Sequence, residues 1–215
     1  MEVIAEQTKL PDPRFADAWE SIKIAHAMKE RLIAQSLLAL TIRQKIPFEA
    51  APLHGLILLS GPPGTGKTTL ARGLANAVTG ALSPAKATFI QIDPHALTSA
   101  ALGKSQKEVT KLFQQTIPEL AMAGPVMVLL DEVETLIVDR QQLSLEANPI
   151  DVHRATDAAL AGLDLLTRQN RNVLLIATTN FPKALDGALL SRADLIEDIG
   201  PPDAAARKEI IKDVL

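Results

Sequence analysis

Residues 61–69 read Gly61-Pro62-Pro63-Gly64-Thr65-Gly66-Lys67-Thr68-Thr69, which fits G-x-x-x-x-G-K-[ST], the pattern of a phosphate-binding P-loop. An apolar run of strand length, 56–60, precedes this stretch, and 68–79, rich in Ala and Leu, follows it as a predicted helix. Glycines in such a loop let backbone N–H groups surround an anion, and the N-terminus of the next helix adds a partial positive charge. The stretch therefore predicts a site for the phosphates of a nucleotide.

The side chains at the end of this loop have separate expected roles. Lys67 is expected to reach the β- and γ-phosphates, and the Thr68 hydroxyl is expected to bind Mg²⁺, while the other loop residues surround the phosphates with backbone groups. The alternative is a plain glycine turn between a buried strand and a helix. That alternative requires the spacing, the Lys, the Thr and both flanking segments to agree by accident.

Composition limits the classes of protein and site. Hydrophobic residues make up 47% of the 215 residues and aromatic residues only 3%, so the chain can bury a sizeable core that must be aliphatic. The formal net charge of −3 gives no electrostatic reason to expect nucleic-acid binding. The absence of Cys excludes disulfides and zinc–cysteine sites. None of the four His residues lies at metal-ligand spacing from another, so Mg²⁺ with a nucleotide is the only metal expected.

The N-terminal segment carries no recognisable targeting signal. Residues 1–7 lack the basic and apolar regions of a signal peptide. No run in the chain approaches the roughly 20 apolar residues that span a bilayer. We therefore expect a soluble protein of the cytoplasm, without a membrane partner.

Apolar runs of strand length alternate with stretches of helical spacing. The predicted strands are 56–60, 88–92, 126–130, 173–177 and 195–199. The predicted helices include one long helix over 18–44 and others that begin at a capping box at Ser105, at Asp151 and at Ala204. Such alternation predicts an α/β fold in which helices cover both faces of a parallel sheet, with the nucleotide at the carboxyl edge of the strands.

Two carboxylates, Asp131 and Glu132, end the apolar run 126–130. At the tip of a strand beside the P-loop, Asp131 is expected to support the hydrated Mg²⁺, and Glu132 is expected to polarise the attacking water. The alternative is a surface Asp-Glu pair after a core strand. Glu134 follows, and we interpret it as a solvated or structural carboxylate.

Two further polar residues lie next to predicted strands: Asn180 follows one strand, and Arg192 precedes another. Asn180 closes the strand that starts at Val173 and is expected to orient the water between Glu132 and the γ-phosphate; an ordinary Asn turn is the alternative. Arg192 precedes the last strand, and its planar guanidinium suits the phosphate oxygens of a neighbouring subunit's nucleotide. An ion pair with Asp194 is the alternative for this Arg.

With these elements in this order, the chain resembles an AAA+ ATPase from about residue 10 to residue 215. Residues 61–69 match Walker A, 126–132 match Walker B, Asn180 matches sensor 1, and Arg192 matches the arginine finger. The resemblance implies ATP and Mg²⁺ as cofactors. It also implies a P-loop NTPase fold whose five-stranded parallel sheet has the strand order 5-1-4-3-2.

The same resemblance divides the chain into three segments. We expect an N-terminal lead-in over 1–15, the nucleotide-binding large subdomain over 16–202, and the start of a helical lid over 203–215. The rest of the lid, which normally carries sensor 2, is expected to be absent from these residues. The N-terminal substrate-recruiting domain of the family is likewise short or missing.

Shorter stretches are similar to the pachytene-checkpoint family, whose members are AAA+ remodellers of HORMA-domain proteins. These stretches are Trp19-Glu20-Ser21-Ile22, Ile92-Asp93-Pro94-His95-Ala96-Leu97, Asp131-Glu132-Val133-Glu134, Asp151-Val152-His153-Arg154, Ser191-Arg192-Ala193-Asp194 and Ile199-Gly200-Pro201-Pro202. The resemblance implies a hexamer that pulls a peptide through a central pore and partly unfolds the HORMA protein. It also implies that Ile22 packs near the adenine, and bacterial relatives occur in anti-phage operons built on cyclic-oligonucleotide signalling.

One departure from the family concerns the grip on a substrate. Pore loop 1 would be 99–103, where family members usually carry an aromatic residue at the position of Ala101. Leu102, assisted by a second pore loop near 143–150, would have to grip the peptide instead. A simple exposed loop is the alternative interpretation of 101–103.

The sequence thus favours an ATP-hydrolysing protein remodeller. An ATP-dependent switch or scaffold that assembles without threading a peptide is the first alternative, and the weak pore-loop chemistry supports it. A DNA-directed AAA+ loader is the second, although the net charge and the lack of a basic tail argue against it. A partner of a protease is the third, and no protease motif such as H-E-x-x-H accompanies it.

Overall fold

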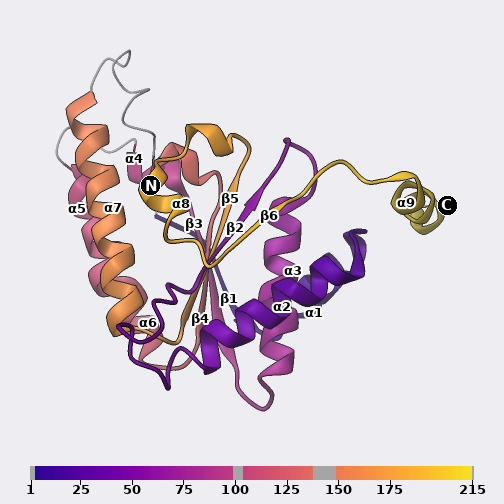
Figure 1. The fold of residues 1–215 in the computed structure, drawn as a ribbon, viewed down its shortest axis with the longest axis horizontal. Coiled ribbons are helices and arrows are strands. Elements are labelled where there is room, and N and C mark those ends of the chain that lie inside the picture. The colour runs from indigo at the N-terminus through magenta and orange to yellow at the C-terminus, as the bar shows by residue number, and fades with distance from the viewer. Residues whose placement is uncertain (1–2, 99–103, 138–148, 215) are drawn as a thin grey trace.

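The computed structural model describes residues 3–98, 104–137 and 149–214. Its centre is a sheet of six strands in the order β1-β3-β4-β5-β2-β6, with helices on both faces (Figure 1). The strands are β1 (Ile4–Leu10), β2 (Leu56–Ser60), β3 (Ala87–Ile92), β4 (Val126–Leu130), β5 (Val173–Thr179) and β6 (Leu195–Asp198). This is the three-layer arrangement that the alternation of strands and helices predicts.

Five of the strands, from β2 to β6, are parallel and adopt the predicted order. Reading β6-β2-β5-β4-β3 across the sheet reproduces 5-1-4-3-2 when only these five strands are numbered. The predicted count of five was wrong, because β1 pairs antiparallel with β3 and adds a sixth strand at the edge. This strand lies in the segment expected to be a lead-in.

The inner strands are apolar along their whole length because helices cover them on both faces. Every residue of β2, β4 and β5 is buried. Alternate side chains therefore feed two separate cores, one on each face of the sheet. The carboxyl ends of β2, β4 and β5 meet at one edge, where the polar residues of the candidate site follow them.

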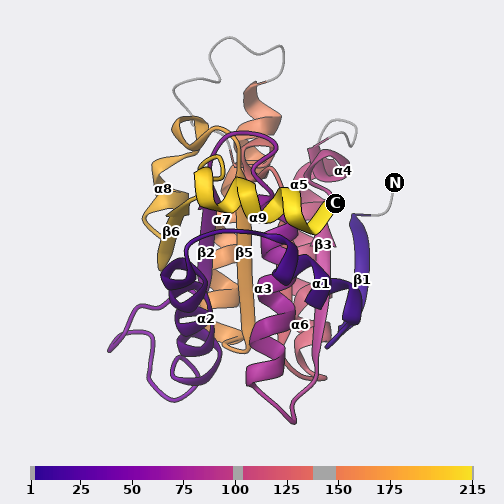
Figure 2. The ribbon, with the colours of Figure 1, turned by 90° about the vertical axis from the view of Figure 1, so that its right-hand side faces the viewer.

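One face of the sheet carries the N-terminal helices, and the other carries the helices between β3 and β5 (Figures 1 and 2). The first group is α1 (Pro13–Ser21), α2 (His26–Thr41) and α3 (Lys67–Ala81). The second group is α4 (Pro94–Thr98), α5 (Lys104–Lys111), the π-helix η1 (Leu112–Thr116), α6 (Ile117–Ala121) and α7 (Pro149–Gln169). Short 3-10 turns at Val133–Thr135 and Pro182–Ala184 and the four-residue helix α8 (Gly187–Leu190) complete the carboxyl edge.

The long helix predicted over 18–44 is in fact two helices. Residues 22–25 separate α1 from α2, and Ile22 takes an extended backbone conformation at the end of α1. Periodicity alone could not place this break, because the apolar residues keep their helical spacing across it. Two helix starts also differ from their predicted caps: α5 is helical from Lys104, so Ser105 lies inside it, and α7 begins at Pro149, before Asp151.

The last helix, α9 (Ala204–Val214), stands away from the body on the side of α1 to α3 (Figure 1). Its described side chains are largely exposed, including Ile211 at 57%. An ion pair of 2.8 Å between Lys23 and Asp213 joins it to the segment between α1 and α2. Within 3–98, 104–137 and 149–214, no helix combines the length and apolar character needed to span a bilayer.

Candidate nucleotide-binding site

The loop between β2 and α3 has the backbone that its glycines predict. Gly61, Gly64 and Gly66 have φ angles of 142°, 80° and 85°, in the region that favours glycine. A Cβ at Gly61 would lie 2.2 Å from the carbonyl oxygen of Ile199, so no larger residue fits there. Helix α3 begins at Lys67 directly after this loop, which places the free N–H groups of its first turn beside the glycines.

The Lys67 side chain is 6% exposed, and its ammonium group donates to the carbonyl oxygens of Gly61 and Pro62, both at 2.8 Å. Burial lowers the pKa of Lys67, and the negative charges of Glu134 and Asp131 oppose that change. The two carbonyl partners belong to the loop itself. The ammonium can therefore exchange them for phosphate oxygens without unfolding any element.

Asp131 is the centre of a hydrogen-bonded cluster that joins three elements. The Thr68 hydroxyl, in the first turn of α3, donates to Asp131 Oδ1 at 2.9 Å. The Thr178 hydroxyl, in β5, donates to the same oxygen at 2.5 Å. The Gln91 amide, in β3, lies 3.5 Å from Asp131 Oδ2. These donors keep the carboxylate oriented toward the P-loop.

Glu132 has a left-handed backbone, with φ 50° and ψ 52°, which costs about 1–3 kcal/mol for a residue other than glycine. Its N–H donates to the Thr178 hydroxyl at 3.1 Å, and this bond holds the unusual conformation. The carboxylate is half exposed and accepts a bond of 3.3 Å from the Asn180 amide. The Nε2 atom of His95 lies 3.6 Å from its other oxygen.

Of the two roles expected for Glu134, a solvated or a structural carboxylate, the structure supports the structural one. Its Oε1 accepts the backbone N–H of Asn180 at 3.0 Å, which fixes the loop after β5. Its Oε2 is buried and has no hydrogen-bond partner among the described residues. Sequence reasoning missed Thr178 and Gln91; their positions at or near the carboxyl ends of strands β5 and β3 were the available signal.

Arg192 follows the end of α8 by two residues, and its partners lie outside this cluster. Its guanidinium forms a bidentate pair with Asp164 of α7, with both distances 2.7 Å, and donates to the carbonyl oxygen of Ala188 at 2.7 Å. The hydrogen bond from Arg192 lowers the pKa of Asp164, and Asp164 in turn raises the pKa of Arg192. The alternative pair with Asp194 is wrong, because Asp194 accepts the N–H groups of His54 and Gly55 instead.

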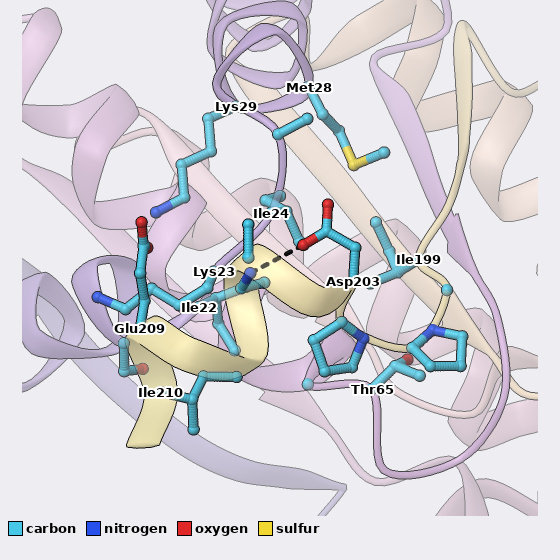
Figure 3. A pocket seen from close by; sticks show the side chains of 18 of the residues that line it. Ile22, Lys23, Ile24, Met28, Lys29, Thr65, Ile199, Asp203, Glu209 and Ile210 are labelled. Carbon is cyan, nitrogen blue, oxygen red and sulfur yellow. Dashed lines mark hydrogen bonds between the residues drawn. The ribbon is translucent and has the colours of Figure 1, made fainter. Parts of the chain in front are cut away.

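A cavity of about 680 Å³ opens beside the P-loop, between the α1–α2 connection and α9. Figure 3 shows apolar side chains from separate elements around it, namely Ile22, Ile24, Met28, Ile199 and Ile210. Ile22 touches the P-loop, since a Cβ at Gly66 would lie 2.6 Å from its Cδ1. The cavity thus offers an apolar space of the kind that a purine ring fills, next to the loop that surrounds phosphates.

The donor set at the P-loop fits Mg²⁺. The Thr68 hydroxyl and the Asp131 carboxylate are hard oxygen donors held 2.9 Å apart, and Mg²⁺ prefers one or two such protein groups together with phosphates and water. No group of three or more His, Cys, Asp or Glu side chains that could hold a metal ion by itself occurs in the described part of the chain. The first candidate pore loop, 99–103, lies outside the described residues, as do residues 143–148 of the second, which was predicted near 143–150.

A known protein family matches most of this chain. Residues 57–201 match the family described as ATPase family associated with various cellular activities (AAA). The chain belongs to the AAA ATPases. The matched range contains the P-loop, Asp131, Glu132, Asn180 and Arg192.

Relatives of this AAA ATPase include proteins of bacteria and animals. It is 53% identical over 207 residues to CD-NTase-associated protein 6 of Pseudomonas aeruginosa, covering 96% of this chain and 68% of that protein. It is 35% identical over 209 residues to the putative pachytene checkpoint protein 2 of Caenorhabditis elegans, covering 95% of this chain and 49% of the relative. The chain therefore spans about half the length of that pachytene relative.

The fold of the AAA ATPase also has solved counterparts. The structure described as the E. coli MS115-1 HORMA:CdnC:Trip13 complex matches with a TM-score of 0.84, over 99% of this chain and 74% of the other. The sequence identity in that comparison is 22%, so the likeness concerns the fold. The membership predicted from the Walker motifs and the pachytene-checkpoint stretches is confirmed.

Proposed function

We propose that this AAA ATPase hydrolyses Mg-ATP and uses the reaction to remodel a HORMA-domain protein. One observation carries the ATPase part: Lys67, Thr68, Asp131, Glu132 and Asn180, which come from three segments of the chain, converge at the carboxyl edge of the sheet. The arrangement places cation donors, hard oxygen donors and a base beside one another.

The phosphates would lie in the loop of 61–69, with Lys67 donating to the β- and γ-oxygens. The Thr68 hydroxyl and Asp131 would hold Mg²⁺, which supplies positive charge to the phosphate oxygens. The two Thr hydroxyls that donate to Asp131 hold its carboxylate in a fixed direction. The purine would occupy the cavity lined by Ile22 and Ile199.

Glu132 would act as the general base toward water, and its geometry supports this role. The carboxylate is half exposed, so a water molecule can reach it. The Asn180 amide donates to one carboxylate oxygen at 3.3 Å and would orient both the base and the water. The left-handed backbone of Glu132 turns the side chain away from the direction that β4 would otherwise give it.

Arg192 would complete the site of an adjacent subunit in a ring, and we propose a hexamer. The guanidinium could leave the pair with Asp164 because that pair is partly exposed, with side chains 22% and 44% accessible. A partly exposed ion pair contributes little stability, so its loss on assembly costs little. The trans arrangement would make hydrolysis depend on assembly.

The HORMA substrate is inferred from relatives rather than from the site. The pachytene checkpoint proteins and CD-NTase-associated protein 6 are similar over almost the whole chain, and one structure of the same fold is described as a HORMA:CdnC:Trip13 complex. The first relative is named for its association with a CD-NTase, and we propose for this protein an antiviral role in the cytoplasm beside such an enzyme. We propose that this protein acts on the corresponding HORMA partner.

The test uses a candidate HORMA protein from the same genome with a fluorescent tag at each end. With Mg-ATP, a remodeller should separate the tags at a rate that depends on ATP, and Glu132→Gln should abolish this change. ATP-dependent assembly that leaves the tags unchanged would instead support the switch or scaffold. Salt-sensitive DNA binding that stimulates hydrolysis would support the loader.

A further inference from the structure

A row of polar side chains connects the N-terminal edge strand to Asp131. It runs from Glu6 in β1 through Arg72 in α3 to Gln91 in β3 and then to Asp131. Glu6, Arg72 and Gln91 belong to none of the motifs that define the ATPase. The row lies on the α3 face of the sheet, beside the first turns of α3.

Glu6 belongs to this row because β1 contains a bulge. The pairing register with β3 shifts between Ile4 and Glu6, so Ile4 pairs with Ile92 while Glu6 pairs with Gln91. Ile4 packs against the core on the α7 face, whereas Leu10, an even number of residues beyond Glu6, is buried in the core on the α3 face. The bulge therefore turns Glu6 to the face that holds the site, which is a common use of bulges.

Arg72 bridges the two strands. Its Nη2 lies 3.0 Å from Glu6 Oε2 and donates to Gln91 Oε1 at 2.5 Å. The Thr8 hydroxyl donates to the other oxygen of Glu6 at 3.2 Å, so both oxygens of that carboxylate are held. The guanidinium also lies over the ring of Phe15, 6.0 Å from its centre.

Gln91 has the one side-chain chemistry that suits its position between a cation and an anion. Its oxygen accepts from Arg72, so its nitrogen points at Asp131 Oδ2, 3.5 Å away. A carboxylate at this position would repel Asp131, and an apolar residue would release both neighbours. Because Arg72 fixes which end of the amide faces Asp131, the orientation of Gln91 depends on β1.

We propose that Gln91, held by Arg72 and Glu6, is a positioning residue for Asp131, and that it makes Mg²⁺ affinity depend on the docking of β1 against β3. This inference rests on the proposed Mg-ATP site. Outer partners of metal-binding carboxylates commonly change metal affinity by 10- to 100-fold when they are removed. The bond of Gln91 is long, so an effect of about 10-fold is expected for Gln91→Leu.

The experiment measures binding of a fluorescent, non-hydrolysable ATP analogue, mant-AMP-PNP, in EDTA and across a Mg²⁺ titration. In EDTA, Gln91→Leu should bind the analogue as the unchanged protein does. In the titration, it should need about 10-fold more Mg²⁺ for half of the affinity gain. Glu6→Gln, which keeps the shape of the side chain and weakens only the hold on Arg72, should shift the titration in the same direction by less.

The matched control is Thr88→Val. Thr88 accepts a bond of 2.7 Å from Lys9 between the same two strands, but it stands on β3 an odd number of residues from Gln91 and so on the opposite face. This variant removes a side-chain contact between the two strands that lies outside the row, while the backbone pairing of β1 and the Glu6–Arg72 contact remain, so its Mg²⁺ titration should match that of the unchanged protein. Thermal unfolding without nucleotide verifies that each variant is folded.

The outcomes separate this inference from the proposed function. If the unchanged protein binds no analogue with Mg²⁺, the proposed ATP site is wrong. If it binds, and Gln91→Leu and Glu6→Gln titrate as the unchanged protein does, only the positioning role is wrong. An equal loss of affinity in EDTA and in Mg²⁺ would also overturn it, because that loss would reflect a general distortion of the site.

Discussion

Two buried cations lie at opposite edges of the sheet and both donate to backbone carbonyl groups. At the carboxyl edge, Lys67 donates to two carbonyls of its own loop. At the amino edge, Arg43 is 1% exposed and donates to the carbonyls of His54, Arg171 and Val173. Burial lowers the pKa of Arg43 to about 10, so it stays protonated at neutral pH.

The difference between them lies in what the carbonyls belong to. The partners of Arg43 precede or begin strands β2 and β5, so the guanidinium holds separate parts of the sheet together. A Cβ at Gly55 would lie 2.0 Å from the Arg43 guanidinium, so this guanidinium is packed tightly against the backbone. The partners of Lys67 belong to the phosphate loop itself, and one of them, the Pro62 carbonyl, also accepts the Thr65 hydroxyl at 3.0 Å. A buried cation is therefore available for a ligand only where its protein partners can be given up.

The largest expected effect concerns a third cation, Arg192, whose partner is a carboxylate. Arg192→Ala should reduce hydrolysis by about 10³- to 10⁵-fold if the guanidinium acts in a neighbouring site, with little effect on ATP binding. Steady-state phosphate release and analogue binding measure the two quantities. Mixing with Lys67→Ala protein should restore part of the activity, and failure of rescue between variants that do assemble would count against the trans role.

A smaller loss is expected when the base is changed at the carboxyl edge. Glu132→Gln should keep ATP binding and reduce turnover by about 10²- to 10⁴-fold, because the amide cannot accept the proton of water. Single-turnover hydrolysis measures this loss. Turnover near that of the unchanged protein would show that another group is the base.

A matched pair of substitutions tests whether Arg43 serves stability while Lys67 serves ligand binding. Arg43→Met should lower the free energy of unfolding by about 3 kcal/mol, because it leaves buried carbonyls without a donor. Lys67→Met should change that free energy by less than about 1 kcal/mol while removing ATP binding, since one of its two carbonyl partners belongs to the exposed Pro62. Urea unfolding and analogue titration measure both variants. Equal destabilisation would refute the distinction.

The smallest effect is the pH dependence of the Asp164–Arg192 pair. The pKa of Asp164 is lowered in the folded state, so the pair stabilises the fold above the unfolded pKa of about 3.9. That contribution is lost as pH falls through the lowered pKa. Asp164→Asn should therefore be less stable by under about 1 kcal/mol at pH 7, with the difference vanishing in acid. Unfolding curves at several pH values measure it, and a constant difference would exclude titration of Asp164 as its cause.

Some elements were predictable because their signal is local. The runs of β2, β4 and β5 are buried on both faces, so their sequences are apolar without interruption. β1 gave no such signal: it is an edge strand of mixed residues, and its bulge interrupts the alternation of faces. The break between α1 and α2 was hidden because apolar residues that line the cavity preserve helical spacing.

By itself, the sequence determined the phosphate loop at 61–69 and the strand tips that carry Asp131, Glu132 and Asn180, because each is a contiguous pattern tied to a strand end. Only the tertiary structure decided that Thr178 and Gln91 surround Asp131, and that Arg192 pairs with Asp164 rather than Asp194. Those contacts join residues that are far apart in the chain. They depend on how strands and helices pack against one another, which local spacing does not encode.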